Sequence, residues 1–269
     1  MSFDFTDKNV FVAGGTSGIN LGIAMAFAEA GARVAVLSRS QAKVDAAVAK
    51  LSAAREGGQA LGFAADVREH TLVEAALAKT QETFGPIDVL VSGAAGNFPA
   101  PAMGISPKGF RSVVEIDLLG TFHVLRAALP HMRQPGGSII NITAPQSYVP
   151  MEMQMHVCAA KAGIDMVTRV GAMEWGPLGV RVNSISPGPI ADTEGVERLA
   201  PTAELRALVA DTVPLKRFGT ARDIGNCCLW LASPMASYVT GAVIAVDGGW
   251  GLGGASVSVA AMKKAFMGG

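Results

Sequence analysis

A regular alternation of short apolar runs with longer helical patterns constrains the fold more than any other feature of this sequence. The runs are apolar almost throughout, which is typical of strands buried on both faces of a parallel sheet. They predict strands at residues 9–13, 33–37, 60–64, 88–91, 138–142, 180–185 and 242–246. Helical patterns fill the intervals near 18–30, 41–55, 69–84, 109–132, 155–175 and 221–232. We therefore predict an α/β fold: a single Rossmann-type domain with a doubly wound parallel sheet of about seven strands and helices on both faces.

The length of 269 residues suits one large α/β domain, which we place at residues 1–250. The alternation breaks between residues 187 and 213, where a long mixed segment follows the sixth predicted strand. We expect this segment to hold a helical lid over a substrate site. The fold does not explain residues 251–269, which we expect to form a C-terminal tail, either free or packed on a neighbouring subunit.

Charge and cysteine content limit the partners of this chain. Lys and Arg total 22 and balance 22 Asp and Glu, so no basic excess predicts binding to nucleic acid or to an anionic membrane. The N-terminus lacks the apolar core of a signal peptide. The three cysteines include the adjacent Cys227 and Cys228 and form no CxxC motif. We therefore predict no disulfide framework, no metal site and a reducing, cytoplasmic location, with a small molecule as substrate.

A glycine-rich turn follows the first predicted strand and opens the first predicted helix. Glycines let the backbone approach a phosphate, and a helix N-terminus supplies free N–H groups. We predict that this turn binds a dinucleotide through Gly14, Thr16, Ser17, Gly18 and Ile19, although an ordinary tight turn is the alternative. Asn20 stands where the usual pattern has a third glycine. Its side chain would either weaken cofactor binding or shift the helix, and the residues leave both alternatives open.

The residues after the second and third predicted strands indicate which dinucleotide binds. No carboxylate follows the second strand to take the ribose hydroxyls. Arg39 stands there instead, and a guanidinium at this place suits a 2′-phosphate, which favours NADP over NAD. A solvated surface arginine is the alternative interpretation. Asp66 and Val67 follow the third strand and are predicted at the adenine edge, unless Asp66 only caps the strand end.

Five further segments turn this general prediction into a specific one. They lie at residues 92–96, 141–144, 159–163, 181–190 and 247–249, and in this order and spacing they resemble the short-chain dehydrogenase/reductase superfamily over roughly residues 6–250. The resemblance implies further cofactor contacts from Ala94, Gly96, Lys161, Pro187, Gly188 and Ile190. It also implies a homotetramer.

The catalytic positions of that superfamily have changed here. The superfamily usually relies on Asn, Ser, Tyr and Lys, and this sequence keeps Lys161 but has Asp117, Ala144 and Val157 at the other three positions. Reduction of a ketone needs a hydroxyl donor at the carbonyl oxygen, which neither alanine nor valine can supply. Tyr148 lies nine residues before Val157, so it would need an unusual loop to substitute. An ordinary alcohol/ketone reaction is therefore disfavoured.

A narrower resemblance accounts for these changes. Residues 94–98, 116–117, 141–144, 154–156, 174–177 and 187–195 resemble the 2,4-dienoyl-CoA reductases, most of all the peroxisomal type. The resemblance implies NADPH as cofactor, an acyl-CoA as substrate, and Asp117 and Lys161 as a catalytic pair that holds a proton-donating water. Candidate substrate contacts are Arg68, Asn97, Phe98 and Arg198.

Three hypotheses remain open from the sequence. The first is the dienoyl-CoA reductase just described. The second is another short-chain oxidoreductase with an atypical site, acting on an acyl thioester or a carbonyl compound. The third is a nucleotide-binding protein without catalytic activity, in which Asp117 is a helix cap or half of a structural ion pair.

Overall fold

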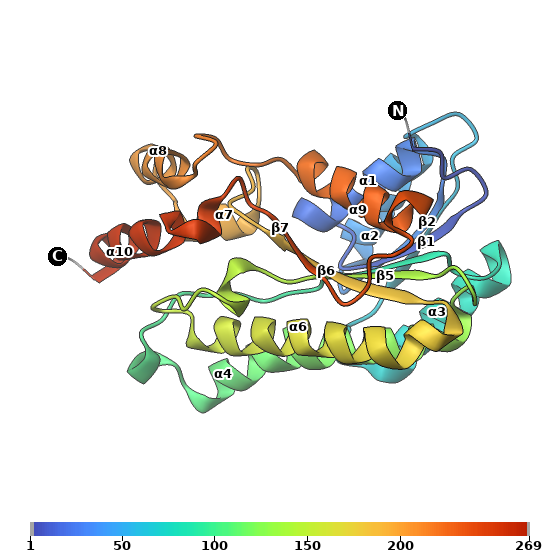
Figure 1. Cartoon of the computed structure of the whole chain (residues 1–269), viewed down its shortest axis with the longest axis horizontal. Helices are drawn as coiled ribbons and strands as arrows, with labels where there is room; N and C mark the ends of the chain where they lie inside the picture. The colour runs from blue at the N-terminus through green and yellow to red at the C-terminus, as the bar shows by residue number, and fades with distance from the viewer. Residues whose placement is uncertain (1–2, 268–269) are drawn as a thin grey trace.

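The fold is a seven-stranded parallel sheet with helices on both faces, as Figure 1 shows. The structure is a computed structural model that describes residues 3–267. The strand order is β3-β2-β1-β4-β5-β6-β7, and every neighbouring pair is parallel. The strands are β1 (Asn9–Ala13), β2 (Arg33–Ser38), β3 (Ala60–Ala64), β4 (Val89–Ser92), β5 (Ser138–Ile142), β6 (Arg181–Pro187) and β7 (Val243–Val246). The predicted doubly wound sheet is confirmed, with strand ends shifted by two residues at most.

Two hydrophobic clusters hold the layers together, and strand β1 contributes to both. Val10 and Val12 point into one cluster, while Phe11 and Ala13 point into the other. All of β1 is buried for this reason, which explains why its sequence is apolar without alternation. Buried residues of helices α1 (Gly18–Glu29) and α9 (Ala221–Ala232) complete the first cluster, and those of α3 (His70–Phe84) and α5 (Gly120–Ala128) complete the second.

The remaining helices follow the same two layers. Helix α2 (Gln41–Ser52) lies beside α1, and the long helix α6 (Met155–Trp175) covers the opposite face together with α4 (Pro107–Val114) (Figure 1). Short 3-10 turns connect these elements, namely η1 (Ala102–Gly104), η3 (Leu129–His131), η4 (Pro145–Ser147), η5 (Gly176–Leu178) and η6 (Pro234–Ala236).

The single helix predicted near 109–132 is interrupted. Between α4 and α5 the chain forms a π-helical segment, η2 (Glu115–Leu119), before it resumes the α-helical path. Asp117 is fully buried in this segment, whereas Leu119 is exposed. Wider π turns of this kind often occur at functional sites. Hydrophobic periodicity could not reveal the interruption, because it reports only which face of a helix is apolar.

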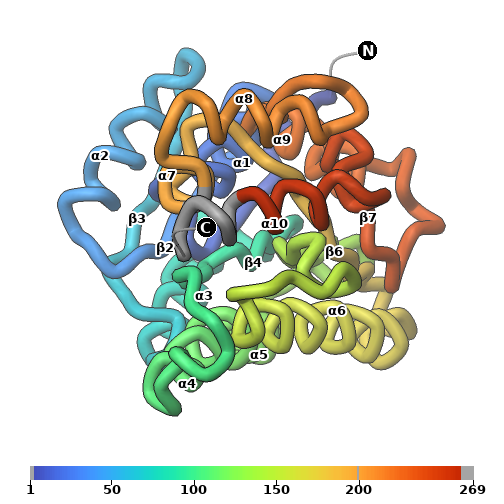
Figure 2. The backbone as a smooth tube through the Cα atoms, turned by 90° about the vertical axis from the view of Figure 1, so that its left-hand side faces the viewer, coloured from blue at the N-terminus to red at the C-terminus, as the bar shows by residue number. Residues whose placement is uncertain are grey.

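The segment predicted as a lid forms helices α7 (Glu194–Leu199) and α8 (Ala203–Thr212). The residues beyond 250 form a 3-10 turn, η7 (Trp250–Leu252), and helix α10 (Gly254–Met267), which packs beside α8. Figure 2 shows α7, α8 and α10 gathered over one end of the sheet. The Trp250 indole N–H donates hydrogen bonds to Ser258 Oγ at 3.1 Å and to Thr212 Oγ1 at 3.3 Å. These bonds attach the start of α10 to the lid.

No helix within residues 3–267 is long and apolar enough to cross a membrane. The same part of the chain holds no group of three or more His, Cys, Asp or Glu side chains placed to bind a metal ion.

The contact between α1 and α9 gives a stability prediction. A Cβ added at Gly22 would lie 2.3 Å from the Cβ of Ala221, so Gly22→Ala forces the two helices apart. We expect a loss of about 1–3 kcal/mol in the free energy of unfolding, measured by denaturant unfolding. Ala221→Gly in the same chain should recover part of it.

The matched control is Gly176→Ala, because nothing lies within 4 Å of a Cβ at that position. It should leave the midpoint of unfolding unchanged or slightly higher. A Gly22→Ala protein as stable as the wild type would contradict the close helix contact.

Candidate active site

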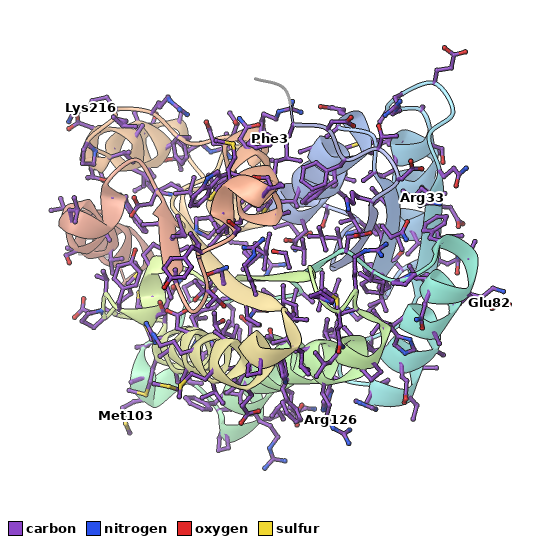
Figure 3. The ribbon with its side chains drawn as sticks, turned by 45° about the vertical axis from the view of Figure 1, so that its right-hand side comes forward. Phe3, Arg33, Glu82, Met103, Arg126 and Lys216 are labelled. Carbon is purple, nitrogen blue, oxygen red and sulfur yellow. The ribbon has the colours of Figure 1, made fainter. Side chains whose placement is uncertain are left out.

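The cleft lies at the carboxyl end of the sheet, where the strand order reverses. Strand β1 sits between β2 and β4, so the connections after β1 and β4 diverge to opposite faces and leave a crevice between them. A cavity of about 460 Å³ opens there. Figure 3 shows Met103 and Lys216, from loops at this end, on the side opposite Arg33 and Glu82. Arg33 is the first residue of β2, so the amino ends of the strands lie away from the cleft.

The glycine-rich turn has the geometry of an anion site. Gly14 has a φ of +80°, and a Cβ there would lie 3.0 Å from the backbone of Ala94. Ser17 is the N-cap residue of α1, but its side chain makes no capping hydrogen bond. The first-turn N–H groups of α1 therefore have no side-chain cap and face the cleft. This arrangement fits the diphosphate of a dinucleotide.

Asn20 occupies the space between the glycine-rich turn and the end of β4. Its Nδ2 donates a hydrogen bond to the Gly93 carbonyl oxygen at 2.7 Å. A Cβ at Gly93 would lie 2.2 Å from Asn20 Oδ1, so only glycine fits beside it. The asparagine side chain thus connects the start of α1 to the end of β4. The sequence pattern showed only that Asn20 replaces a glycine and did not indicate this contact.

All the cofactor contacts predicted from sequence line this one cavity. They come from six separate segments, at Gly14, Thr16, Ser17, Gly18, Ile19, Arg39, Asp66, Val67, Ala94, Gly96, Lys161, Pro187, Gly188 and Ile190. Arg68 forms an ion pair with Asp66 at 2.7 Å, and hydrogen bonding from Arg68 lowers the pKa of the Asp66 carboxyl.

The four predicted substrate contacts divide into two groups. Asn97 lines the cavity, whereas Arg68, Phe98 and Arg198 lie outside its lining. Arg198 donates a hydrogen bond to the Asn97 carbonyl oxygen at 2.7 Å, and Arg68 pairs with Asp66, so each arginine contacts a lining residue. Phe98 packs behind the wall, with its ring centroid 4.3 Å from that of His156.

Asp117 and Lys161 meet inside the cavity. Lys161 Nζ lies 3.3 Å from Asp117 Oδ2 and donates a hydrogen bond to the Ile142 carbonyl oxygen at 3.2 Å. Asp117 Oδ1 accepts a hydrogen bond from the Gly96 N–H at 2.7 Å. Oδ2 lies within ion-pair distance but has no aligned hydrogen bond, so its remaining lone pair is free for a small donor. A buried carboxylate and a buried ammonium neutralise each other here.

The walls beside this pair carry no hydroxyl at the expected places. Val157 and Ala144 line the cavity, and Val157 packs with Val113 and Ala160. Tyr148 is half exposed and lies outside the cavity lining, with its hydroxyl 3.4 Å from Ser186 Oγ. The geometry therefore does not let Tyr148 replace the phenol that Val157 lacks.

The sequence did not predict several residues at or beside the site, Trp250 and His156 among them. Trp250 lines the cavity directly after the Asp-Gly-Gly segment. His156 is completely buried against Phe98, and neither ring nitrogen has an aligned hydrogen bond. Burial lowers the pKa of His156, and the backbone of Phe98 and the negative charge of Asp117 oppose that shift only partly. In the sequence, His156 belongs to the resembling segment 154–156 and directly precedes Val157.

An anion-binding turn at the switch point of a parallel sheet, with a lysine and a carboxylate deeper in the same cleft, defines a Rossmann-type oxidoreductase. Residues 13–251 match the family described as enoyl-(acyl carrier protein) reductase. The chain belongs to the short-chain dehydrogenase/reductase family.

Similar proteins match this chain over nearly its whole length. A peroxisomal 2,4-dienoyl-CoA reductase of Rattus norvegicus is 44% identical, over 90% of this chain and 83% of its own. One from Saccharomyces cerevisiae is 42% identical, over 93% and 86%. Both are named as producing (3E)-enoyl-CoA. The crystal structure of levodione reductase superposes with a TM-score of 0.88 at 31% identity, over 93% of this chain and 99% of that chain.

The buried imidazole gives a pH prediction. The His156 pKa lies below its ordinary value of 6.5 because burial disfavours the charged form. As pH falls through about 6.5, the unfolded chain takes up a proton that the folded chain does not, so stability falls. In His156→Phe we expect a shallower loss of unfolding free energy between pH 7 and pH 5, measured by urea unfolding.

Measurements at pH 8 serve as the control, because the imidazole is neutral there in both the folded and the unfolded chain. The difference in unfolding free energy between the wild type and His156→Phe at pH 8 therefore reports packing alone. Parallel pH profiles for the two proteins would contradict a lowered pKa at His156.

Proposed function

We propose that this protein reduces a 2,4-dienoyl-CoA, or a similar conjugated acyl thioester, with NADPH. The observation that carries the proposal is the buried Asp117–Lys161 pair in a cleft whose neighbouring positions, Ala144 and Val157, have no hydroxyl. Relatives at 42–44% identity are named for this reaction. A site that cannot donate to a ketone oxygen is suited to a reaction whose proton ends on carbon.

The reaction forms two C–H bonds. A bound nicotinamide would supply a hydride to the far end of the conjugated system, which would leave a dienolate with negative charge on the thioester oxygen. A proton then adds to carbon, which leaves one double bond in a 3-enoyl-CoA. A water held between Asp117 Oδ2 and Lys161 Nζ is the proton donor in this proposal, and the Lys161 ammonium makes good the proton that the water loses.

The remaining residues orient this chemistry. The Ile142 carbonyl holds Lys161, which we also place at the nicotinamide ribose, and the Gly96 N–H fixes the Asp117 carboxylate. We assign to Asn97, which lines the same cavity, the role of stabilising the thioester oxygen. The low exposure of Asp117 and Lys161 strengthens each of these electrostatic contacts.

We assign the cofactor as NADPH because Arg39 lines the cleft at the end of β2, where a 2′-phosphate would sit. Arg68 and Arg198, each in contact with a lining residue, are proposed to bind CoA phosphates, with Phe98 against the acyl chain.

The predicted homotetramer is supported by exposed apolar side chains on η2, α5 and α6, namely Leu119, Phe122, Met166, Val170 and Met173. A cytoplasmic location stays a prediction.

The test is NADPH oxidation with a 2,4-dienoyl-CoA, followed at 340 nm. Asp117→Asn keeps an acceptor for the Gly96 N–H but removes the charge, and Lys161→Ala removes the ammonium. We expect kcat to fall about 10²–10⁴-fold in each, the range for a lost proton-transfer group, with NADPH binding retained in Asp117→Asn.

Glu115→Gln is the matched control, because Glu115 lies on the same π-helical segment but outside the cavity lining. It should turn over at close to the wild-type rate. Circular dichroism confirms folding of Lys161→Ala, which leaves Asp117 buried without its cation. Full activity in Asp117→Asn would refute the mechanism, and an inactive wild type would reject the dienoyl substrate.

A further inference from the structure

The first residues of the lid lie over the cofactor end of the cleft. Thr193, the N-cap residue of α7, has its Cγ2 3.8 Å from the place of a Cβ on Gly18, at the anion-binding turn. Glu194 follows, and its Oε1 lies 3.8 Å from Nζ of Lys43 in the first turn of α2. The lid is therefore linked across the cleft mouth by an ion pair.

This ion pair sits beside the arginine assigned to the 2′-phosphate. Arg39 directly follows β2, and Lys43 comes four residues later on the opening turn of α2. Arg39, Lys43 and Glu194 all line the same cavity. Two cations thus face the expected phosphate position, and one of them is paired with a carboxylate of the lid.

Glu194 has a second cation within reach. Arg198, one helical turn further along α7, lies 3.1 Å from Glu194 Oε2 and also donates to the Asn97 carbonyl oxygen at 2.7 Å. If Glu194 leaves Lys43, it keeps Arg198 as a partner. The attachment of the lid to the loop after β4 is then preserved.

We propose that Lys43 is a second 2′-phosphate-binding residue beside Arg39, and that Glu194 is an internal competitor that holds this ammonium until NADPH displaces it. The inference rests on the proposed NADPH dependence. A carboxylate and a phosphate both present anionic oxygens to the ammonium, and like charges this close repel. NADH carries no 2′-phosphate, so it leaves the Lys43–Glu194 pair intact.

The solvent exposure of the Lys43–Glu194 pair sets the expected size of the changes in NADPH affinity. The Lys43 and Glu194 side chains are 57% and 62% exposed, so the pair is screened by solvent and salt. Removal of the competitor should therefore tighten NADPH binding by about two- to five-fold, as an exposed pair allows. Loss of the phosphate-binding ammonium should cost about ten-fold, because a charge-assisted bond to phosphate is stronger than an exposed ion pair.

The experiment is a calorimetric titration of the full-length protein with NADPH and with NADH. Glu194→Gln should lower the Kd for NADPH two- to five-fold, and Lys43→Gln should raise it about ten-fold, with the Kd for NADH changed less than two-fold in both. In the double variant the gain from Glu194→Gln should disappear, because the ammonium it releases is gone. Glu197→Gln, on the same helix but outside the cavity lining, is the control for charge and should change neither Kd.

Three failures are distinguishable. Equal binding of NADPH and NADH by the wild type would overturn the cofactor assigned under the proposed function. A preference for NADPH over NADH that is the same in Lys43→Gln as in the wild type would leave that function standing and overturn the role of Lys43. A gain from Glu194→Gln that persists in the double variant would show that Glu194 acts by direct repulsion, and would overturn the competition for Lys43.

Discussion

Burial of the parallel sheet on both faces is the constraint on which the rest of this structure depends. Helices cover both sides of β1, so its four apolar side chains are used for packing. Only the strand ends remain open to solvent and to ligands. The divergence of the connections after β1 and β4 then creates one crevice at the carboxyl edge. Binding and catalysis are concentrated there because the central strands β1, β4 and β5 are buried along their whole length.

The chemistry in that crevice depends on placing a carboxylate and an ammonium together away from water. Such burial is costly unless each charge is paired and hydrogen-bonded. The π-helical segment brings Asp117 to the Gly96 N–H, and α6 brings Lys161 to the Ile142 carbonyl oxygen. The two charges then lie 3.3 Å apart with apolar Val157 nearby. In the proposed mechanism a proton held at this place adds to carbon, since Ala144 and Val157 have no hydroxyl to serve a carbonyl oxygen.

The lid extends the same electrostatic arrangement over the cofactor end. Its first helix places Glu194 between Lys43 and Arg198, while α10 secures the second helix through the Trp250–Thr212–Ser258 contacts. Both ends of the lid are therefore attached to the body of the protein. The attachment at Lys43 is an exposed ion pair, whereas that at Trp250 is a hydrogen bond to the half-buried hydroxyl of Thr212. The cofactor side is thus the weaker attachment and the easier one for a ligand to displace.

The sequence by itself determined the layered fold and the residues that line one cleft at the carboxyl end of the sheet. An apolar run such as 9–13 predicts a buried strand from its own residues. The glycine-rich turn at Gly14 and Gly18 indicates a binding site because it directly follows the first strand. Only the tertiary structure decided which distant residues meet. Asp117 and Lys161 are far apart in the chain, and their contact depends on a π-helical turn that periodicity does not report. The same holds for Asn20 with Gly93 and for Lys43 with Glu194, because contacts between separate elements arise from packing and are not encoded in local pattern.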